Sequence, residues 1–253
     1  MALTESQRAV IVSGLGAARG FGFALAGPGA LIEHGIASRP TDDADWFSTM
    51  EHAGFFDLAV EAVTERLQED GFALLPVKRS STFFKFNVST PGGEVVEVDM
   101  SLDWRRYNPA EIAIGPVLDI QDAAAAKVAT IFSRGEARDF IDLWCIRKTG
   151  LWSDTELFAM AQDRDDRINV PMFRTMLAEV GRSRDQRFAD YGLTLDQIAD
   201  IRSAATEFSA HIEDAEPGDF ILPDHTGAVH VKAHANGRGG FTRHHWRTLP
   251  PRN

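Results

Sequence analysis

The spacing of apolar residues divides this chain into a mixed part and a helical part. Short apolar runs that alternate with polar residues or end in turns predict strands over residues 21–26, 42–47, 72–76, 82–88 and 95–100. In the same part, apolar residues at helical spacing predict helices over residues 4–20, 30–34 and 55–69. From residue 119 onward only helical spacing recurs, which predicts helices over residues 119–133, 136–147 and, in several pieces, 153–213.

These elements predict an α+β fold in three parts. A small mixed β-sheet flanked by helices occupies residues 1–115, a helical lobe occupies residues 116–215, and a basic extension occupies residues 216–253. The Pro-Gly-Gly turn at residues 91–93 joins the last two predicted strands as a hairpin. With 253 residues, the chain is long enough to bury a substantial core.

Composition is that of a soluble globular protein, with 44% hydrophobic and 25% charged residues. The single cysteine, Cys145, excludes an internal disulfide framework and fits a reducing compartment. The apolar stretch at residues 9–30 is interrupted by Arg19 and several glycines, so it predicts neither a signal peptide nor a membrane span. We therefore expect a cytoplasmic protein with no membrane partner.

Charge is distributed unevenly along the chain, which has a formal net charge of −11. Residues 225–253 contain five Lys or Arg residues and no Asp or Glu, so this tail carries +5 and the remainder carries −16. Five of the eight histidines also lie there, but their spacing matches no zinc pattern. A basic, glycine-rich tail with Phe241 and Trp246 favours contact with RNA, and a solvated, flexible terminus is the alternative.

Asp43 and Asp45 are the first candidates for chemistry. Residues two apart on a strand point to the same face, so this pair places two carboxylates side by side. Such carboxylates repel each other, and a divalent cation is the partner that best stabilises them. The Asp-x-Asp pattern is also common in solvated turns, so its surroundings decide between the two interpretations.

The surroundings of the pair favour phosphate chemistry. Before it, Gly27 and Gly29 form a turn that opens onto a predicted helix, where backbone N–H groups and the helix dipole attract an anion. After it, the predicted strand at residues 95–100 carries a third carboxylate, Asp99. Three carboxylates facing a glycine turn are what two-metal phosphoryl or nucleotidyl transfer requires.

Two ordered sets of motifs contain or follow these carboxylates. The first is Leu25-Ala-Gly-Pro-Gly-Ala-Leu31, followed by Arg39-Pro-Thr-Asp-Asp-Ala-Asp-Trp-Phe47. The second is Asp122-Ala-Ala-Ala-Ala-Lys127, then Arg134, then Arg138-Asp-Phe-Ile-Asp-Leu143. In this order they resemble the motifs of the AbiEii-type nucleotidyltransferases, bacterial toxins within the DNA polymerase β-like superfamily. The resemblance covers residues 20–145. The chain departs from the family pattern at Pro28 and Gly29, where Gly or Ser and then Ser or Thr are usual.

The resemblance implies a metal site and a nucleotide site. Asp43, Asp45 and Asp99 correspond to the catalytic metal ligands, and Asp99 also to the base toward the acceptor hydroxyl. Glu97 shares the strand face of Asp99 and is the alternative for that position. The implied nucleotide-binding residues are Gly27, Gly29, Arg39, Thr41, Lys127, Arg134 and Asp139.

Two of the implied assignments have equally simple structural alternatives. Arg39 would orient the aspartate loop or touch phosphate, and a surface salt bridge is the alternative. Asp142 belongs to the same helical element as Asp139, but as the i+4 neighbour of Arg138 it is also explained as half of a helix-stabilising pair.

As a relative of this family, the chain would move a nucleoside monophosphate from an NTP to an acceptor hydroxyl with Mg²⁺ or Mn²⁺. The acceptor would be tRNA or a protein, and a cognate antitoxin would be a partner in a toxin–antitoxin or abortive-infection system. One alternative is a small-molecule enzyme of the aminoglycoside-modifying kind, which the acidic body favours. The other is a degenerate relative that binds nucleotide without turnover, which only the Gly-Pro-Gly turn supports.

Overall fold

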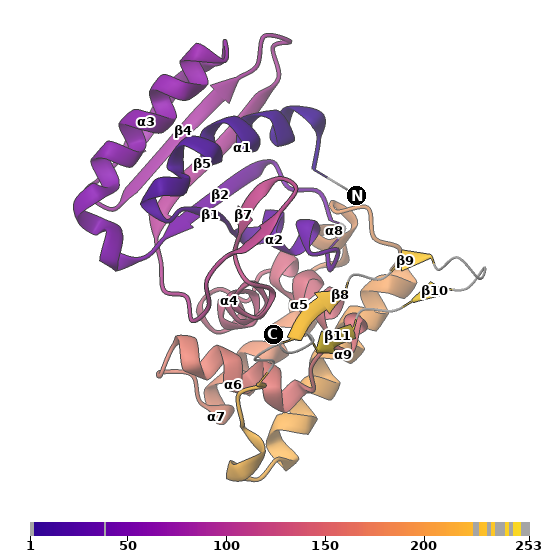
Figure 1. The fold of residues 1–253 in the computed structure, drawn as a ribbon. Coiled ribbons are helices and arrows are strands. Elements are labelled where there is room, and N and C mark those ends of the chain that lie inside the picture. The colour runs from indigo at the N-terminus through magenta and orange to yellow at the C-terminus, as the bar shows by residue number, and fades with distance from the viewer. Residues whose placement is uncertain are drawn as a thin grey trace. The chain divides into compact units, whose positions relative to one another are not determined.

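The computed structural model describes residues 3–37, 39–224, 228–231, 234–235, 241–242 and 245–248. It divides into two compact units (Figure 1). The first unit comprises Met1–Glu33 and Pro40–Ala123, and the second comprises His34–Arg39 and Ala124–Asn253. The short segment His34–Arg39 therefore leaves the first unit and joins the second, which no sequence pattern indicates.

The first unit is built on a seven-stranded sheet with the order β3-β4-β5-β2-β1-β7-β6. The strands are β1 Ala24–Leu25, β2 Asp43–Ser48, β3 Ala73–Arg79, β4 Phe83–Ser89, β5 Val95–Leu102, β6 Ala110–Ile112 and β7 Gly115–Val117. β2 pairs with β5 in parallel and β1 pairs with β7 in parallel, whereas the other neighbours are antiparallel. This mixed sheet, flanked by helices and followed by a largely helical half, confirms the predicted α+β fold class.

Helices α1 Glu5–Ala18 and α3 Phe56–Glu69 pack on each other and cover one face of the sheet (Figure 1). Alternate residues of β2 are buried against them, among them Ala44 and Trp46. A Cβ at Gly14 of α1 would lie 2.4 Å from a ring carbon of Trp46, so glycine is what lets the helix approach the indole. The intervening residues of each strand point to the opposite face of the sheet.

Two parts of the first unit differ from the predicted elements. Helix α2 Gly27–Glu33 begins three residues before the expected start, so the glycine turn is the first turn of the helix. Pro28 suits that position, because the first N–H groups of a helix have no intrahelical partner. The pattern also missed β6 and β7, which are only three residues each and extend the sheet beside β1.

The second unit consists mainly of helices. They are α4 Ile120–Ser133, whose first residues belong to the first unit, α5 Ala137–Thr149, α6 Asp154–Arg164, α7 Val170–Leu177, α8 Asp185–Ala189 and α9 Leu195–Asp214. Short 3-10 turns lie at Arg19–Phe21 and Met50–Phe55 in the first unit and at Ala178–Gly181 and Pro217–Asp219 in the second. Phe158, Phe173 and Phe208 are fully buried and their rings contact one another in the helical core.

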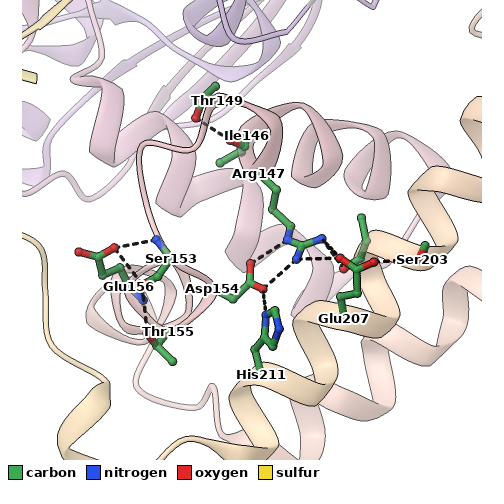
Figure 2. Close-up of polar contacts among 11 residues, drawn as sticks. Ile146, Arg147, Thr149, Ser153, Asp154, Thr155, Glu156, Ser203, Glu207 and His211 are labelled. Carbon is green, nitrogen blue, oxygen red and sulfur yellow. Dashed lines mark hydrogen bonds and ion pairs between the residues drawn. The ribbon is translucent and has the colours of Figure 1, made fainter. Parts of the chain in front are cut away.

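A polar clamp ties three of these helices together (Figure 2). Arg147 on α5 donates hydrogen bonds of 2.7 and 2.9 Å to the two carboxylate oxygens of Asp154 at the start of α6. It also donates to the backbone oxygen of Ala204 on α9, and His211 of α9 contacts the same Asp154 carboxylate. These charge-assisted bonds fix the helices of the lobe against one another.

The predicted basic extension contains two short strand pairs in its described residues. β8 Ala228–Val231 pairs with β11 His245–Thr248, and β9 His234–Ala235 pairs with β10 Phe241–Thr242. The residues Lys232, Arg238, Arg243 and Arg252, which give the tail most of its charge, lie outside the described residues. Contact of this tail with RNA stays a prediction.

Candidate active site

Four carboxylates share the face of the β2–β5 pair that lies opposite α1 and α3. Asp45 stands beside Asp99 in the parallel register, and Asp43 stands beside Glu97. All four residues are partly exposed, whereas the residues between them are buried. Two adjacent strands with period-2 alternation thus bring together the predicted metal ligands Asp43, Asp45 and Asp99.

The absence of a side chain at Gly27 leaves room for the Asp45 carboxylate. The backbone of Gly27 has a φ of 56°, in the left-handed region that favours glycine. A Cβ at this position would lie 1.8 Å from Oδ2 of Asp45, so any other residue would displace the carboxylate. The backbone N–H of Ala26 donates a 2.7 Å hydrogen bond to the Asp45 carbonyl oxygen, which fixes the two segments together. Gly29 lies inside α2 and packs against Leu25.

Thr41 orients the other carboxylate of the Asp-x-Asp pair. Its hydroxyl donates a hydrogen bond to Oδ1 of Asp43. The Thr41 carbonyl oxygen in turn accepts a 2.6 Å hydrogen bond from the side-chain amide of Gln7, which is buried on α1. The structure thus places Thr41, predicted as a nucleotide-binding residue, in contact with a carboxylate of the candidate metal site.

Lys85 on β4 is a site residue that the sequence analysis did not single out. It lies opposite Asp99 in the antiparallel β4–β5 register, and its ammonium group hydrogen-bonds Glu97 and lies 3.6 Å from Oδ1 of Asp99. The hydrogen bond to Glu97 raises the pKa of Lys85 above its ordinary value. The sequence shows a lysine on the polar face of a predicted strand, but it does not reveal the register that places this lysine beside the carboxylates.

Burial raises the pKa of Asp99 above that of an ordinary carboxyl group. The positive charge of Lys85 acts in the opposite direction, and the negative charges of Glu97 and Asp43 add to the effect of burial. Oδ1 of Asp99 is buried and has no hydrogen-bond partner. The Asp99 carboxylate is therefore the least satisfied member of the face.

The donor atoms of this face fit a divalent cation, although they are not gathered around a single point. Carboxylate oxygens are the preferred ligands of Mg²⁺ and Mn²⁺. The orphaned oxygen of Asp99 and the space that Gly27 leaves beside Asp45 are features that a cation would use. Within the described part of the chain, however, no three His, Cys, Asp or Glu side chains are grouped so as to hold a metal ion.

In the second unit, the predicted nucleotide-binding residues Arg39 and Lys127 meet on Asp142. The Arg39 guanidinium donates bonds of 2.6 and 2.9 Å to the two oxygens of Asp142, and the ammonium of Lys127 lies 3.3 Å from Oδ2. Asp142 is 0% exposed and Arg39 is 7% exposed. Arg39 therefore makes a buried ion pair, which corrects the alternative of a surface salt bridge.

Asp139 and Arg134 form a second ion pair in the same motif, in which the aspartate is buried and the arginine is exposed. Arg134 donates a 2.9 Å hydrogen bond to Asp139, and the hydroxyl of Thr130 donates another. Burial disfavours the Asp139 carboxylate, but the hydrogen bonds and charge of Arg134 outweigh it and hold the Asp139 pKa below its ordinary value. Asp139 also accepts the backbone N–H of Glu136, so it caps the start of α5.

Arg138 does not pair with Asp142, which corrects the i,i+4 interpretation. Its guanidinium lies 2.9 Å from the Glu136 carboxylate at the start of α5. Asp142 is instead neutralised by Arg39, which lies 103 residues away in sequence, and by Lys127.

Three cavities of about 580, 790 and 640 Å³ are lined by none of the predicted site residues. The cavity of about 580 Å³ lies beside the Arg147 clamp, between Trp144 and His211. Four of its lining residues, Arg147, Asp154, Glu207 and His211, contact one another across the helices (Figure 2). Among the helices that the structure describes, none combines the length and apolar character needed to cross a bilayer.

Comparison with known proteins identifies one matching family. The model for the nucleotidyl transferase AbiEii toxin of type IV toxin–antitoxin systems matches residues 22–219, which is more than half of the chain. No curated protein sequence matches the chain.

Among solved structures, a candidate nucleotidyltransferase from H. pylori is 15% identical, covers 85% of this chain and 99% of its own, and has a TM-score of 0.49. The nucleotidyltransferase toxin MenT4 from Mycobacterium tuberculosis H37Rv is 17% identical, covers 86% of this chain and 92% of its own, and has a TM-score of 0.43. These likenesses are too distant to transfer the role of any single residue.

Proposed function

This chain belongs to the AbiEii nucleotidyl transferase toxin family, and from that premise we propose that it transfers a nucleoside monophosphate from an NTP to an acceptor hydroxyl in a reaction that requires Mg²⁺ or Mn²⁺. The observation that carries the metal dependence is the pairing of Asp45 with Asp99 across β2 and β5, with Gly27 packed against the Asp45 carboxylate. Carboxylates from two strands on one sheet face are the arrangement that this chemistry uses.

Each residue of the carboxylate face has a proposed task. Asp43, Asp45 and Asp99 would hold the divalent cation, and Thr41 orients Asp43 through its hydroxyl. When bound, a divalent cation neutralises charge on the triphosphate and favours ionisation of the attacking hydroxyl. Asp99 is the proposed acceptor of the proton from that hydroxyl, because its Oδ1 has no hydrogen-bond partner within the protein.

The residues proposed to bind the triphosphate are those that the family motifs imply. Lys127 and Arg39 both contact the Asp142 carboxylate, and the cationic groups that meet there suit a phosphate. Arg134 and Asp139 are proposed as nucleotide-binding residues, and their mutual hydrogen bond and the cap that Asp139 makes fix the start of α5. Gly27 and Gly29 are proposed to line the donor site with backbone alone.

We propose tRNA as the acceptor, with protein as the competing possibility that the experiment separates. The chain is acidic overall, yet residues 71–93 contain no Asp or Glu and include Lys78, Arg79 and Lys85. These residues form β3 and β4, which continue the sheet beyond Asp99. Although Arg79 pairs with Asp57 and Lys85 with Glu97, β3 and β4 bring no carboxylate of their own next to the proposed base, which favours a polyanionic acceptor.

The test is transfer of label from each α-³²P-NTP in the presence of Mg²⁺ or Mn²⁺ with total tRNA and bacterial protein. Label should appear on RNA, disappear with chelator and disappear in Asp45→Asn. Asp42→Asn is the matched control, because Asp42 is exposed, precedes β2 and undergoes the same isosteric change. Label on protein alone would overturn the RNA acceptor, and metal-independent transfer would overturn the metal site.

The toxin-system proposal has its own test in cells. Induction of the wild-type chain should arrest growth, Asp45→Asn should not, and Asp42→Asn should arrest growth as the wild type does. A cognate antitoxin, expected as a separate chain, should restore growth when it is expressed together with the toxin. Harmless induction of an active wild-type protein would contradict the toxin role while leaving the enzymatic proposal intact.

A further inference from the structure

Asp99 has two neighbours across the sheet that differ in charge. On β2, its partner in the parallel register is Asp45. On β4, its partner in the antiparallel register is Lys85. The Asp99 carboxylate therefore stands between the proposed metal site and a lysine that belongs to the protein.

The contacts of Lys85 distinguish the two carboxylates of β5. Its ammonium makes a direct hydrogen bond to Glu97, whereas Oδ1 of Asp99 lies 3.6 Å away, within ion-pair range but beyond a hydrogen bond. That same oxygen is buried and has no hydrogen-bond partner. Glu97 is thus satisfied by the protein, and Asp99 is left needing a ligand.

We propose that Lys85 is a positioning residue of the metal site. It holds Glu97 in an ion pair and so leaves Asp99 as the third metal ligand. Its own positive charge also weakens binding of the divalent ion by the protein without nucleotide. The inference rests on the proposed function, because it presupposes a cation held by Asp43, Asp45 and Asp99. It settles the choice between Asp99 and Glu97, which the sequence leaves open.

Two consequences follow from the charge of Lys85. An ammonium group within ion-pair distance of a metal ligand repels an arriving divalent cation, so removing its charge should tighten metal binding. The same ammonium contacts both acidic side chains of β5 from the β4 side, so its removal should change the surroundings of Glu97 as well as those of Asp99.

The first experiment measures Mn²⁺ binding to the full chain without nucleotide, by electron paramagnetic resonance of the unbound ion. Lys85→Gln should tighten binding about 3- to 10-fold, and Lys85→Arg should stay within about 2-fold of the wild type. Lys78→Gln is the matched control. Lys78 is exposed, lies opposite Lys85 in the β3–β4 register and has its ammonium 5.7 Å from the Phe83 ring centre, so its removal should leave Mn²⁺ affinity unchanged.

The second experiment separates Glu97 from Asp99 in the Lys85→Gln background. Adding Asp99→Asn should weaken Mn²⁺ binding about 30-fold or more, whereas adding Glu97→Gln should weaken it by less than about 3-fold. Equal losses from the two additions would overturn the proposal that Lys85 leaves Asp99, and not Glu97, as the metal ligand. Equal Mn²⁺ affinity of Lys85→Gln and the wild type would overturn the proposal that the charge of Lys85 weakens metal binding.

The outcome for the wild type distinguishes the two proposals. If the wild type binds Mn²⁺ and Asp45→Asn does not, the metal site stands and the Lys85 variants alone decide the present inference. If the wild type shows no Asp45-dependent binding of Mn²⁺, the metal dependence in the proposed function fails and the inference fails with it. Thermal unfolding of each variant, followed by circular dichroism, excludes loss of fold as the cause.

Discussion

The two clusters of charge in this protein are built in opposite ways. In the first unit, Asp43, Asp45 and Asp99 are partly exposed on a sheet face, and like charges stand side by side. In the second unit, Asp139 and Asp142 are 0% exposed, and each is matched to arginine or lysine side chains. A charge that is removed from water needs a partner from the protein, whereas a charge that stays in contact with water is stable without one and can bind a ligand.

This difference separates residues that serve stability from residues that serve activity. Breaking a buried ion pair leaves the remaining partner without compensation and destabilises the fold. Removing one of several neighbouring carboxylates relieves repulsion and costs little stability. The carboxylate face and the buried cluster should therefore respond to the same Asp→Asn change with opposite signatures.

The largest effect is expected for Asp45→Asn on the carboxylate face. Nucleotidyl transfer should fall about a thousandfold or more, which corresponds to about 4 kcal/mol of barrier, because a ligand of the divalent cation is lost. The free energy of unfolding should change by less than about 0.5 kcal/mol. Transfer assays and urea denaturation on the same preparation measure both quantities. A loss of activity below tenfold would remove Asp45 from the metal site.

For Asp142→Asn in the buried cluster, the main effect should be on the free energy of unfolding. Arg39 and Lys127 would keep their charges in the interior with no carboxylate between them, so we expect a loss of about 3–5 kcal/mol in the free energy of unfolding. Urea denaturation beside Asp42→Asn, the exposed control, measures this loss. A change as small as that of the control would mean that water or another group already compensates the two cations.

The sequence predicts the carboxylate face better than the buried cluster, for a physical reason. The alternation within each strand follows from local pattern, so the shared face of Asp43 and Asp45 is predictable, whereas the place of Asp99 beside them also needs the β2–β5 pairing. Partners that depend on register or on distant folding are not predictable. Lys85 reaches the face only through the β4–β5 pairing, and Arg39 reaches Asp142 across 103 residues.

The start of α2 shows the same limit in a local element. The sequence suggested that Gly27 and Pro28 close a strand in a turn, with the helix starting at Ala30, but the helix begins at Gly27. Proline is well tolerated in the first turn of a helix, so the departure from the family pattern at Pro28 does not break the local structure. Glycine and proline are common both in turns and in the first turn of a helix, so these residues alone do not show where the helix begins.

A smaller effect is expected at Asp119, a partly buried carboxylate whose charged neighbour is another carboxylate, Asp122. Burial raises the pKa of Asp119 to about 6, and its oxygen accepts the backbone N–H of Gln121 at the start of α4. Because the folded-state pKa lies above that of the unfolded chain, the stability present below about pH 4 is lost as the pH rises through 6.

Asp119→Asn should therefore match the wild type near pH 4 and exceed it above pH 7, by at most about 3 kcal/mol at about 1.4 kcal/mol per pKa unit. Asparagine keeps the capping oxygen, so the helix start is preserved. Urea denaturation from pH 4 to pH 8 measures the difference. A constant difference across this range would show that the Asp119 carboxyl does not titrate with a raised pKa.

The smallest effect is expected at Arg138, which lies on the same helix as the buried aspartates but pairs with exposed Glu136. Exposed ion pairs contribute little, so Arg138→Ala should cost less than about 0.5 kcal/mol in the free energy of unfolding. A double-mutant cycle with Glu136→Ala should give a coupling of the same small size, and a cycle with Asp142→Asn should give none. A large coupling between Arg138 and Asp142 would extend the buried cluster to the helix surface, and the contrast between the two kinds of charge would then be one of degree.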